Sequence, residues 1–200
     1  MKHSTENHMP HPDGWIAVTL LAVLIITRSG HFGTSFKLPD ASWAMFWLAG
    51  ALTTRWWWPA VLMVAAALVD YFVFTHGVIS HGVSGYCVTP AYPFLIPAYL
   101  SLWLAGRWMV NSLHLNLRSL SHMTASIVSG VTVAFIISNV SFYVFSDYFA
   151  TLSAWHYAQD VAHYWPHYLI DTALYAFTGL LIRFIIRTAC NIHASHQASP

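Results

Sequence analysis

Cys87 is the residue whose surroundings point most directly to chemistry. It lies in the segment HGVSGYCVTPAY, two residues before Thr89 and Pro90. Threonine followed by proline is a helix start signal, because threonine can cap free amides and proline fits the first helical position. A thiol beside a helix N-terminus is held more readily as thiolate, which is a nucleophile and a soft metal ligand. The alternative interpretation is a small buried apolar side chain.

Two carboxylates lie within apolar segments. Asp70 occurs in ALVDYFVF and Asp171 in HYLIDTALY. A carboxylate in a membrane-spanning segment is unfavourable unless it faces a polar cavity or a partner, so each is a candidate functional residue. The alternative for each is a structural hydrogen bond to a neighbouring helix, for instance to a tyrosine.

Three prolines, Pro90, Pro93 and Pro97, fall at the start of the next apolar segment. Proline interrupts helical hydrogen bonding, so we expect this end to be irregular or kinked and to line a cavity. Tyr92 and Tyr99 would then project from a bent segment and could hydrogen-bond a ligand. An aromatic belt at the membrane interface explains tyrosines at these positions equally well.

The amino-acid composition indicates the class of protein to which these residues belong. Of 200 residues, 57% are hydrophobic and 8% are charged, and the net charge is +1. A soluble domain carries roughly a quarter of its residues as charged side chains, so we predict an all-α integral membrane protein. The low and scattered charge argues against nucleic acid as a partner. Six membrane-spanning helices are predicted, at residues 15–27, 41–53, 57–75, 90–110, 122–146 and 165–187.

The basic residues predict the orientation, because cytoplasmic loops carry the excess of Lys and Arg. With both termini in the cytoplasm, six of the eight basic residues lie inside and only Arg28 and Lys37 lie outside. The whole chain, 1–200, is then one transmembrane domain with polar tails at 1–13 and 189–200. The outer side receives Cys87 and one group of histidines: His31, His76, His81, His156, His163 and His167.

Several segments together resemble a known family. A glycine loop carrying His31 runs into LPDASWAMFWLAG, and ALVDYFVF and YCVTPAYPFLIPAY follow. This pattern resembles the BtuM-type cobalamin transporters, which are solitary relatives of the substrate-binding S-components of energy-coupling-factor (ECF) transporters. The resemblance covers roughly residues 15–187, and its most specific part is Cys-Val-Thr-Pro-Ala-Tyr at Cys87 to Tyr92.

The resemblance implies a six-helix S-component bundle in the bacterial inner membrane, with cobalamin (vitamin B12) bound from the periplasmic side. It implies that Cys87 ligates the corrin cobalt, holds the cobalamin base-off and promotes loss of cyanide from cyanocobalamin. By position, His31, Asp70 and Tyr92 match other pocket residues, and Tyr86 beside the cysteine is a further candidate for ligand binding. A thiolate is independently a suitable soft ligand for a cobalt centre.

Two other functions are open on the residues alone. Six apolar helices also occur in membrane sensory modules, and the outer histidines could serve a haem or copper centre. Axial histidines usually project from facing helices, whereas most of these are expected in loops or at helix ends. The first helix lacks the Ala-x-x-x-Ala pattern typical of S-components that dock on an ECF energising module, because Ala17 is followed four residues later by Leu21. Such a partner is therefore compatible with the chain but not required.

Overall fold

The computed structural model describes residues 12–30, 39–81, 89–109 and 117–197, and in these ranges it is helical without any strand. Each of the six predicted apolar segments coincides for most of its length with one α-helix. A short 3-10 helix, η2, precedes the fourth of them, and a further helix, α6, was not predicted. In chain order the elements are α1 (Pro12–Gly30), α2 (Ser42–Leu52), α3 (Trp58–His81), η2 (Tyr92–Phe94), α4 (Leu95–Trp108), α5 (Leu117–Phe145), α6 (Ala154–Ala162) and α7 (Trp165–Gln197).

Two of these helices are long and apolar enough to cross a membrane. They are Leu117–Phe145 and Trp165–Ala189, with 29 and 25 residues. The apolar parts of α1, α2 and α3 are shorter, so six membrane spans remain a prediction. Large apolar side chains are exposed along several helices, and a soluble monomer seldom exposes such extensive apolar surface. On α7 these side chains include Leu174, Phe177, Leu181, Ile182, Phe184, Ile185 and Ile186.

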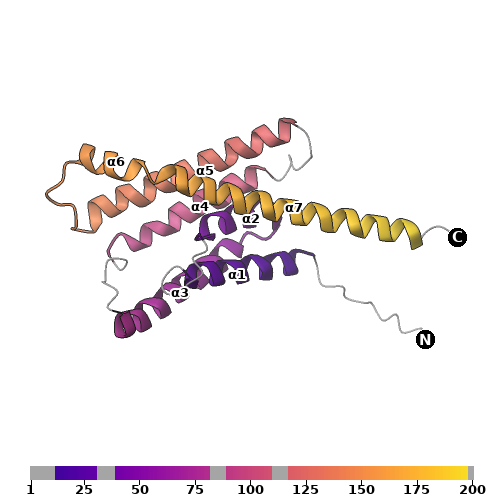
Figure 1. The fold of residues 1–200 in the computed structure, drawn as a ribbon, viewed down its shortest axis with the longest axis horizontal. Coiled ribbons are helices and arrows are strands. Elements are labelled where there is room, and N and C mark those ends of the chain that lie inside the picture. Colours follow the sequence, from indigo (N-terminus) through magenta and orange to yellow (C-terminus); the bar gives the residue numbers. More distant parts are fainter. Residues whose placement is uncertain (1–11, 31–38, 82–88, 110–116, 198–200) are drawn as a thin grey trace.

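The helices run back and forth, so that α1 begins and α7 ends at the same end of the molecule (Figure 1). The last part of α7 extends beyond the other helices at that end. The start of α1 and the end of α7 therefore lie on one side of the bundle.

Helix α2 forms the centre of the fold. All eleven of its residues, SWAMFWLAGAL, are buried, and it carries no charge. At 1.5 Å per residue it is roughly 16 Å long, about half the thickness of the hydrocarbon layer. The short apolar segment predicted at 41–53 is therefore a helix enclosed by its neighbours, chiefly α4, α1 and α7.

Glycines allow this enclosure. A Cβ atom added to Gly50 of α2 would collide with the carbonyl oxygen of Trp103, and one added to Gly106 of α4 would collide with that of Trp47. On α7, a Cβ at Gly179 would lie 2.9 Å from Leu48 Cδ1. The backbones of α2 and α4 therefore approach each other at a point where no side chain fits.

Helix α6 is short and begins at a cap. The hydroxyl of Ser153 accepts a hydrogen bond from the His156 amide at 3.3 Å, and Tyr157 is buried against the rest of the fold. A search for long apolar runs misses this helix because its sequence, AWHYAQDVA, is mostly polar or small.

Candidate functional site

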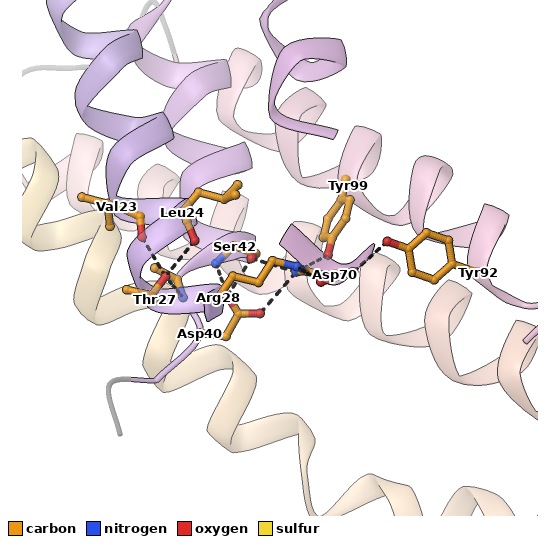
Figure 2. A network of polar contacts seen from close by, with 10 residues as sticks. Val23, Leu24, Thr27, Arg28, Asp40, Ser42, Asp70, Tyr92 and Tyr99 are labelled. Carbon is orange, nitrogen blue, oxygen red and sulfur yellow. Dashed lines mark hydrogen bonds and ion pairs between the residues drawn. The ribbon is translucent and has the colours of Figure 1, made fainter. Parts of the chain in front are cut away.

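A cluster of polar side chains lies where α1 ends and four other segments meet (Figure 2). Arg28 is in the last turn of α1, where the partial negative charge of the helix C-terminus favours a cation. Its guanidinium makes a two-pronged ion pair with Asp70 of α3, with Nε 2.5 Å from Oδ1 and Nη2 2.6 Å from Oδ2. This geometry is among the strongest that side chains form, since both hydrogen bonds are charge-assisted.

The third nitrogen of Arg28 joins α1 to α2 and α4. Nη1 donates to Ser42 Oγ at 2.9 Å and to Tyr99 Oη at 3.0 Å, and it lies 3.5 Å from Asp40 Oδ2. Ser42 in turn donates its hydroxyl to Asp40 Oδ1 at 2.6 Å. One guanidinium therefore holds side chains from three other parts of the chain.

Tyr92 completes the cluster on the side of η2. Its hydroxyl donates to Asp70 Oδ2 at 2.7 Å. The backbone amide of Tyr92 donates to the Thr89 carbonyl at 2.9 Å, and the Ala91 amide donates to Thr89 Oγ1 at 3.3 Å. Thr89 thus bonds the turn that places Tyr92, but the helix start that the Thr-Pro signal predicted at Pro90 is wrong, because η2 begins at Tyr92 and α4 only at Leu95. The 3-10 turn before α4 also confirms the irregular start expected from the prolines.

Local bonds fix the segment that carries Asp40. The hydroxyl of Thr27 accepts a hydrogen bond from the Ala41 amide at 3.2 Å, and Tyr175 of α7 donates its hydroxyl to the Pro39 carbonyl at 2.9 Å. The Ser42 amide donates to Asp40 Oδ1 at 2.9 Å, which satisfies a free amide at the start of α2. Asp40 is thereby held at the edge of the cluster from both α1 and α7.

The cluster is partly buried and carries a net negative charge. The exposed fractions of the side chains are 11% for Arg28, 21% for Asp70 and 33% for Asp40. One arginine against two aspartates leaves a formal charge of −1. Tyr99 is buried and stacks on Phe46, with ring centroids 4.2 Å apart, so the base of the cluster is rigid while Asp40 and Tyr92 lie at its accessible edge.

Of the site residues predicted from the sequence, the structure brings Asp70 and Tyr92 together. His31, Tyr86 and Cys87 lie outside the described residues, so the predictions made for them remain predictions. Asp171 is half-buried on α7 and takes no part in the hydrogen bonds of the Arg28 cluster. The alternative interpretation of Asp70 was a structural hydrogen bond to a tyrosine. That bond is present, from Tyr92, and Asp70 also forms the ion pair with Arg28.

Sequence reasoning missed Arg28, Asp40 and Ser42 as members of the site. The sequence did contain a signal for Arg28. Arg28 ends one apolar segment, and Asp70 lies in the outer part of another. Two opposite charges in apolar segments must pair or lie in water. The choice between those outcomes depends on how close the two helices are, which the sequence does not show.

Three of the outer histidines, His156, His163 and His167, make local contacts. His156 Nδ1 lies 3.1 Å from Ser153 Oγ, His167 Nδ1 lies 3.3 Å from the His163 carbonyl oxygen, and the His163 ring packs on Tyr164. Within the described ranges, no three His, Cys, Asp or Glu side chains are grouped so that they could hold a metal ion. These histidines therefore give no support to the haem or copper alternative.

The arrangement supplies a rigid, negatively charged polar surface at the end of an apolar bundle, suited to a neutral or cationic polar ligand.

Comparison with protein-family models finds no match to this chain, and comparison with curated proteins finds no significant relative.

Proposed function

We propose that this chain takes up cobalamin across the bacterial inner membrane, with both termini in the cytoplasm. The corrinoid binds from the periplasmic side, base-off, and Cys87 ligates its cobalt. A thiolate donates electron density to cobalt and weakens the bond to the ligand on the opposite face. Cyanide then leaves as an anion, and for every two corrinoids that go from cobalt(III) to cobalt(II), two molecules of a thiol reductant are oxidised to one disulfide and release two protons.

The observation that carries the proposal is that Tyr92 hydrogen-bonds Asp70, the carboxylate that Arg28 holds in an ion pair. The resemblance implies both residues in the corrinoid pocket, and the structure joins them by a hydrogen bond of 2.7 Å although they come from α3 and η2. Tyr92 follows Cys87 by five residues, and the Thr89 hydroxyl accepts a hydrogen bond from the Ala91 amide just before Tyr92. A polar, partly exposed cluster at this point suits the rim of a large ligand that carries many amide groups.

Membrane insertion is supported by composition and by the molecular surface. Two helices meet the length and hydropathy needed to span a bilayer, and large apolar side chains are exposed along α1, α3, α5 and α7. The two carboxylates of the cluster are compatible with such a setting because Arg28 neutralises one of them and Asp40 lies at its accessible edge.

The test is the visible absorption spectrum of the purified protein in detergent, after incubation with cyanocobalamin and a thiol and removal of unbound ligand. We expect one retained corrinoid per chain, with a spectrum that shifts as cyanide leaves. In Cys87→Ala this thiolate-dependent spectrum should be absent. Cys190→Ala is the matched control, because it removes the other cysteine of the chain and should leave the spectrum unchanged.

If the unaltered protein retains no corrinoid, the proposal is wrong and the sensory alternative is favoured. Retention with the same shifted spectrum in Cys87→Ala would show that another group ligates cobalt. A spectrum characteristic of haem in the purified protein would favour the metal-binding alternative.

A further inference from the structure

The hydrogen bonds of Asp70 determine what Tyr92 can offer to a ligand. Asp70 accepts three bonds, from Arg28 Nε at 2.5 Å, Arg28 Nη2 at 2.6 Å and the Tyr92 hydroxyl at 2.7 Å. A carboxylate paired with a guanidinium is ionised and can only accept hydrogen bonds. The single hydroxyl hydrogen of Tyr92 is therefore committed to Asp70.

What remains on Tyr92 is the oxygen, which can still accept. The residue is half-buried at the edge of the cluster, where a bound molecule can reach it. We propose that Arg28 is a positioning residue that, through Asp70, presents the Tyr92 oxygen as an acceptor for an amide N–H group at the rim of the bound corrinoid. This inference rests on the proposed function, because the corrinoid supplies the amides.

The charge of the cluster favours the same ligand chemistry. Asp40 and Asp70 outnumber Arg28, and Asp40 lies only 3.5 Å from the guanidinium that it shares with Asp70. A ligand carboxylate placed against Tyr92 would meet an acceptor and a net negative charge, whereas a carboxamide of the same shape donates and is neutral. The site should therefore distinguish a corrinoid amide from the corresponding acid.

The proposal can be tested with the three monocarboxylic acids made from cyanocobalamin by hydrolysis of one propionamide each. Equilibrium binding to the full-length protein in detergent is measured for cyanocobalamin and for each acid. We expect the unaltered protein to bind one of the acids at least about tenfold more weakly than cyanocobalamin, since that acid leaves an acceptor unpaired and adds a repelled charge. In Tyr92→Phe the preference should fall by a factor of about three or more, because the unpaired acceptor is gone while the charge of the cluster remains.

Variants of Arg28 separate positioning from a purely structural role. In Arg28→Gln the guanidinium no longer holds the Asp70 carboxylate toward Tyr92, so the carboxylate can turn away and leave the tyrosine hydrogen free to donate to the ligand. The part of the preference that depends on the Tyr92 acceptor should then be lost, so that adding Tyr92→Phe to Arg28→Gln no longer changes the ratio of the two affinities, while the Cys87-dependent spectrum of the bound corrinoid is retained. Arg28→Lys keeps a cation beside Asp70 and should keep the preference.

Arg55→Gln is the matched control, because Arg55 is exposed, faces the Trp57 ring and lies outside the cluster. It should leave both affinity and preference unchanged. Gel filtration and circular dichroism establish whether each variant is folded. If Arg28→Gln does not fold, the binding preference of Tyr92→Phe tests the proposal instead. Equal binding of all three acids and cyanocobalamin, or an undiminished preference in Tyr92→Phe, overturns the positioning role while leaving corrinoid uptake intact. Failure of the unaltered protein to retain any corrinoid overturns both.

Discussion

Arg28 is the residue on which the polar cluster depends, because it contacts Asp70, Asp40, Ser42 and Tyr99. A buried ion pair is weak proof of stability, since removing two charges from water offsets much of their attraction. Its presence is better explained by the geometry it imposes, as it aligns side chains from several elements at one point. Removal of one partner is nevertheless unfavourable, because the other charge stays partly buried with fewer partners.

The Asp70→Ala substitution tests this pair. We expect the free energy of unfolding to fall by about 1–3 kcal/mol, less than for a fully buried pair, because the pair is partly buried and Asp40 still faces the guanidinium. The measurement is the unfolding transition in detergent followed by circular dichroism. Asp160→Ala, which removes an exposed carboxylate on α6, is the control and should change stability little. Equal stability of the two variants would contradict the ion pair.

A second buried link is the bond between α2 and α5. The fully buried indole of Trp47 donates from Nε1 to Ser126 Oγ at 3.0 Å, and Ser126 donates to the Ala105 carbonyl at 2.6 Å. Ser126→Ala should lower the free energy of unfolding by about 1–3 kcal/mol, because it leaves the indole N–H without an acceptor. Ser121→Ala, at an exposed position on the same helix, should have a smaller effect in the same unfolding experiment. The reverse order would argue against the link.

At the scale of the elements, the central contact is the close crossing of α2 and α4. It depends on Gly50 and Gly106, each of which lies against a backbone carbonyl of the other helix. Backbone atoms cannot move aside as a flexible side chain can, so even one added methyl group forces the helices apart. Separation of α2 from α4 also disturbs the cluster, because Ser42 and Tyr99 lie on these two helices.

We therefore expect Gly106→Ala to destabilise the protein by several kcal/mol or to prevent its recovery in folded form, since overpacking here meets backbone atoms. Gly14→Ala is the matched substitution, because a Cβ at Gly14 meets no atom within 4 Å and alanine has the higher helix propensity. The yield of monodisperse protein and its unfolding midpoint are compared for the two. Similar values would show that the helices do not cross at these glycines.

At the scale of the whole molecule, the direction of the helices and the bias of the basic residues make a joint prediction about topology. Helix α1 begins, and helix α7 ends, at the same end of the bundle (Figure 1). Most basic residues are assigned to the cytoplasmic side. The start of α5 should then lie inside the cell, and the turn between α5 and α6 should lie outside.

Single cysteines test the topology in a background that carries Cys87→Ser and Cys190→Ser. Thr151→Cys, in the exposed turn before α6, should react with a membrane-impermeant maleimide added to intact cells. Arg118→Cys, exposed at the start of α5, should react only after the membranes are opened. Labelling of Arg118→Cys and protection of Thr151→Cys in intact cells would reverse the proposed orientation.

The sequence alone determined the helical class, the approximate place of each long helix and the chemical interest of Asp70, Tyr92 and Tyr99. Apolar runs and turn residues are local signals, so they can be interpreted without knowing what packs against them. The proline-rich start before α4 was predictable for the same reason. The six-span topology and the roles of Cys87, His31 and Tyr86 are still predictions.

Only the tertiary structure decided that α2 is enclosed, that α2 and α4 meet at Gly50 and Gly106, and that Arg28 pairs with Asp70. The ion pair joins residues 42 positions apart, and nothing local in either segment specifies that separation. Whether two charges in apolar helices meet depends on the distance and rotation between those helices, and these follow from the packing of the whole bundle. The elements were therefore predictable from local physical chemistry, whereas the candidate site required their arrangement in space.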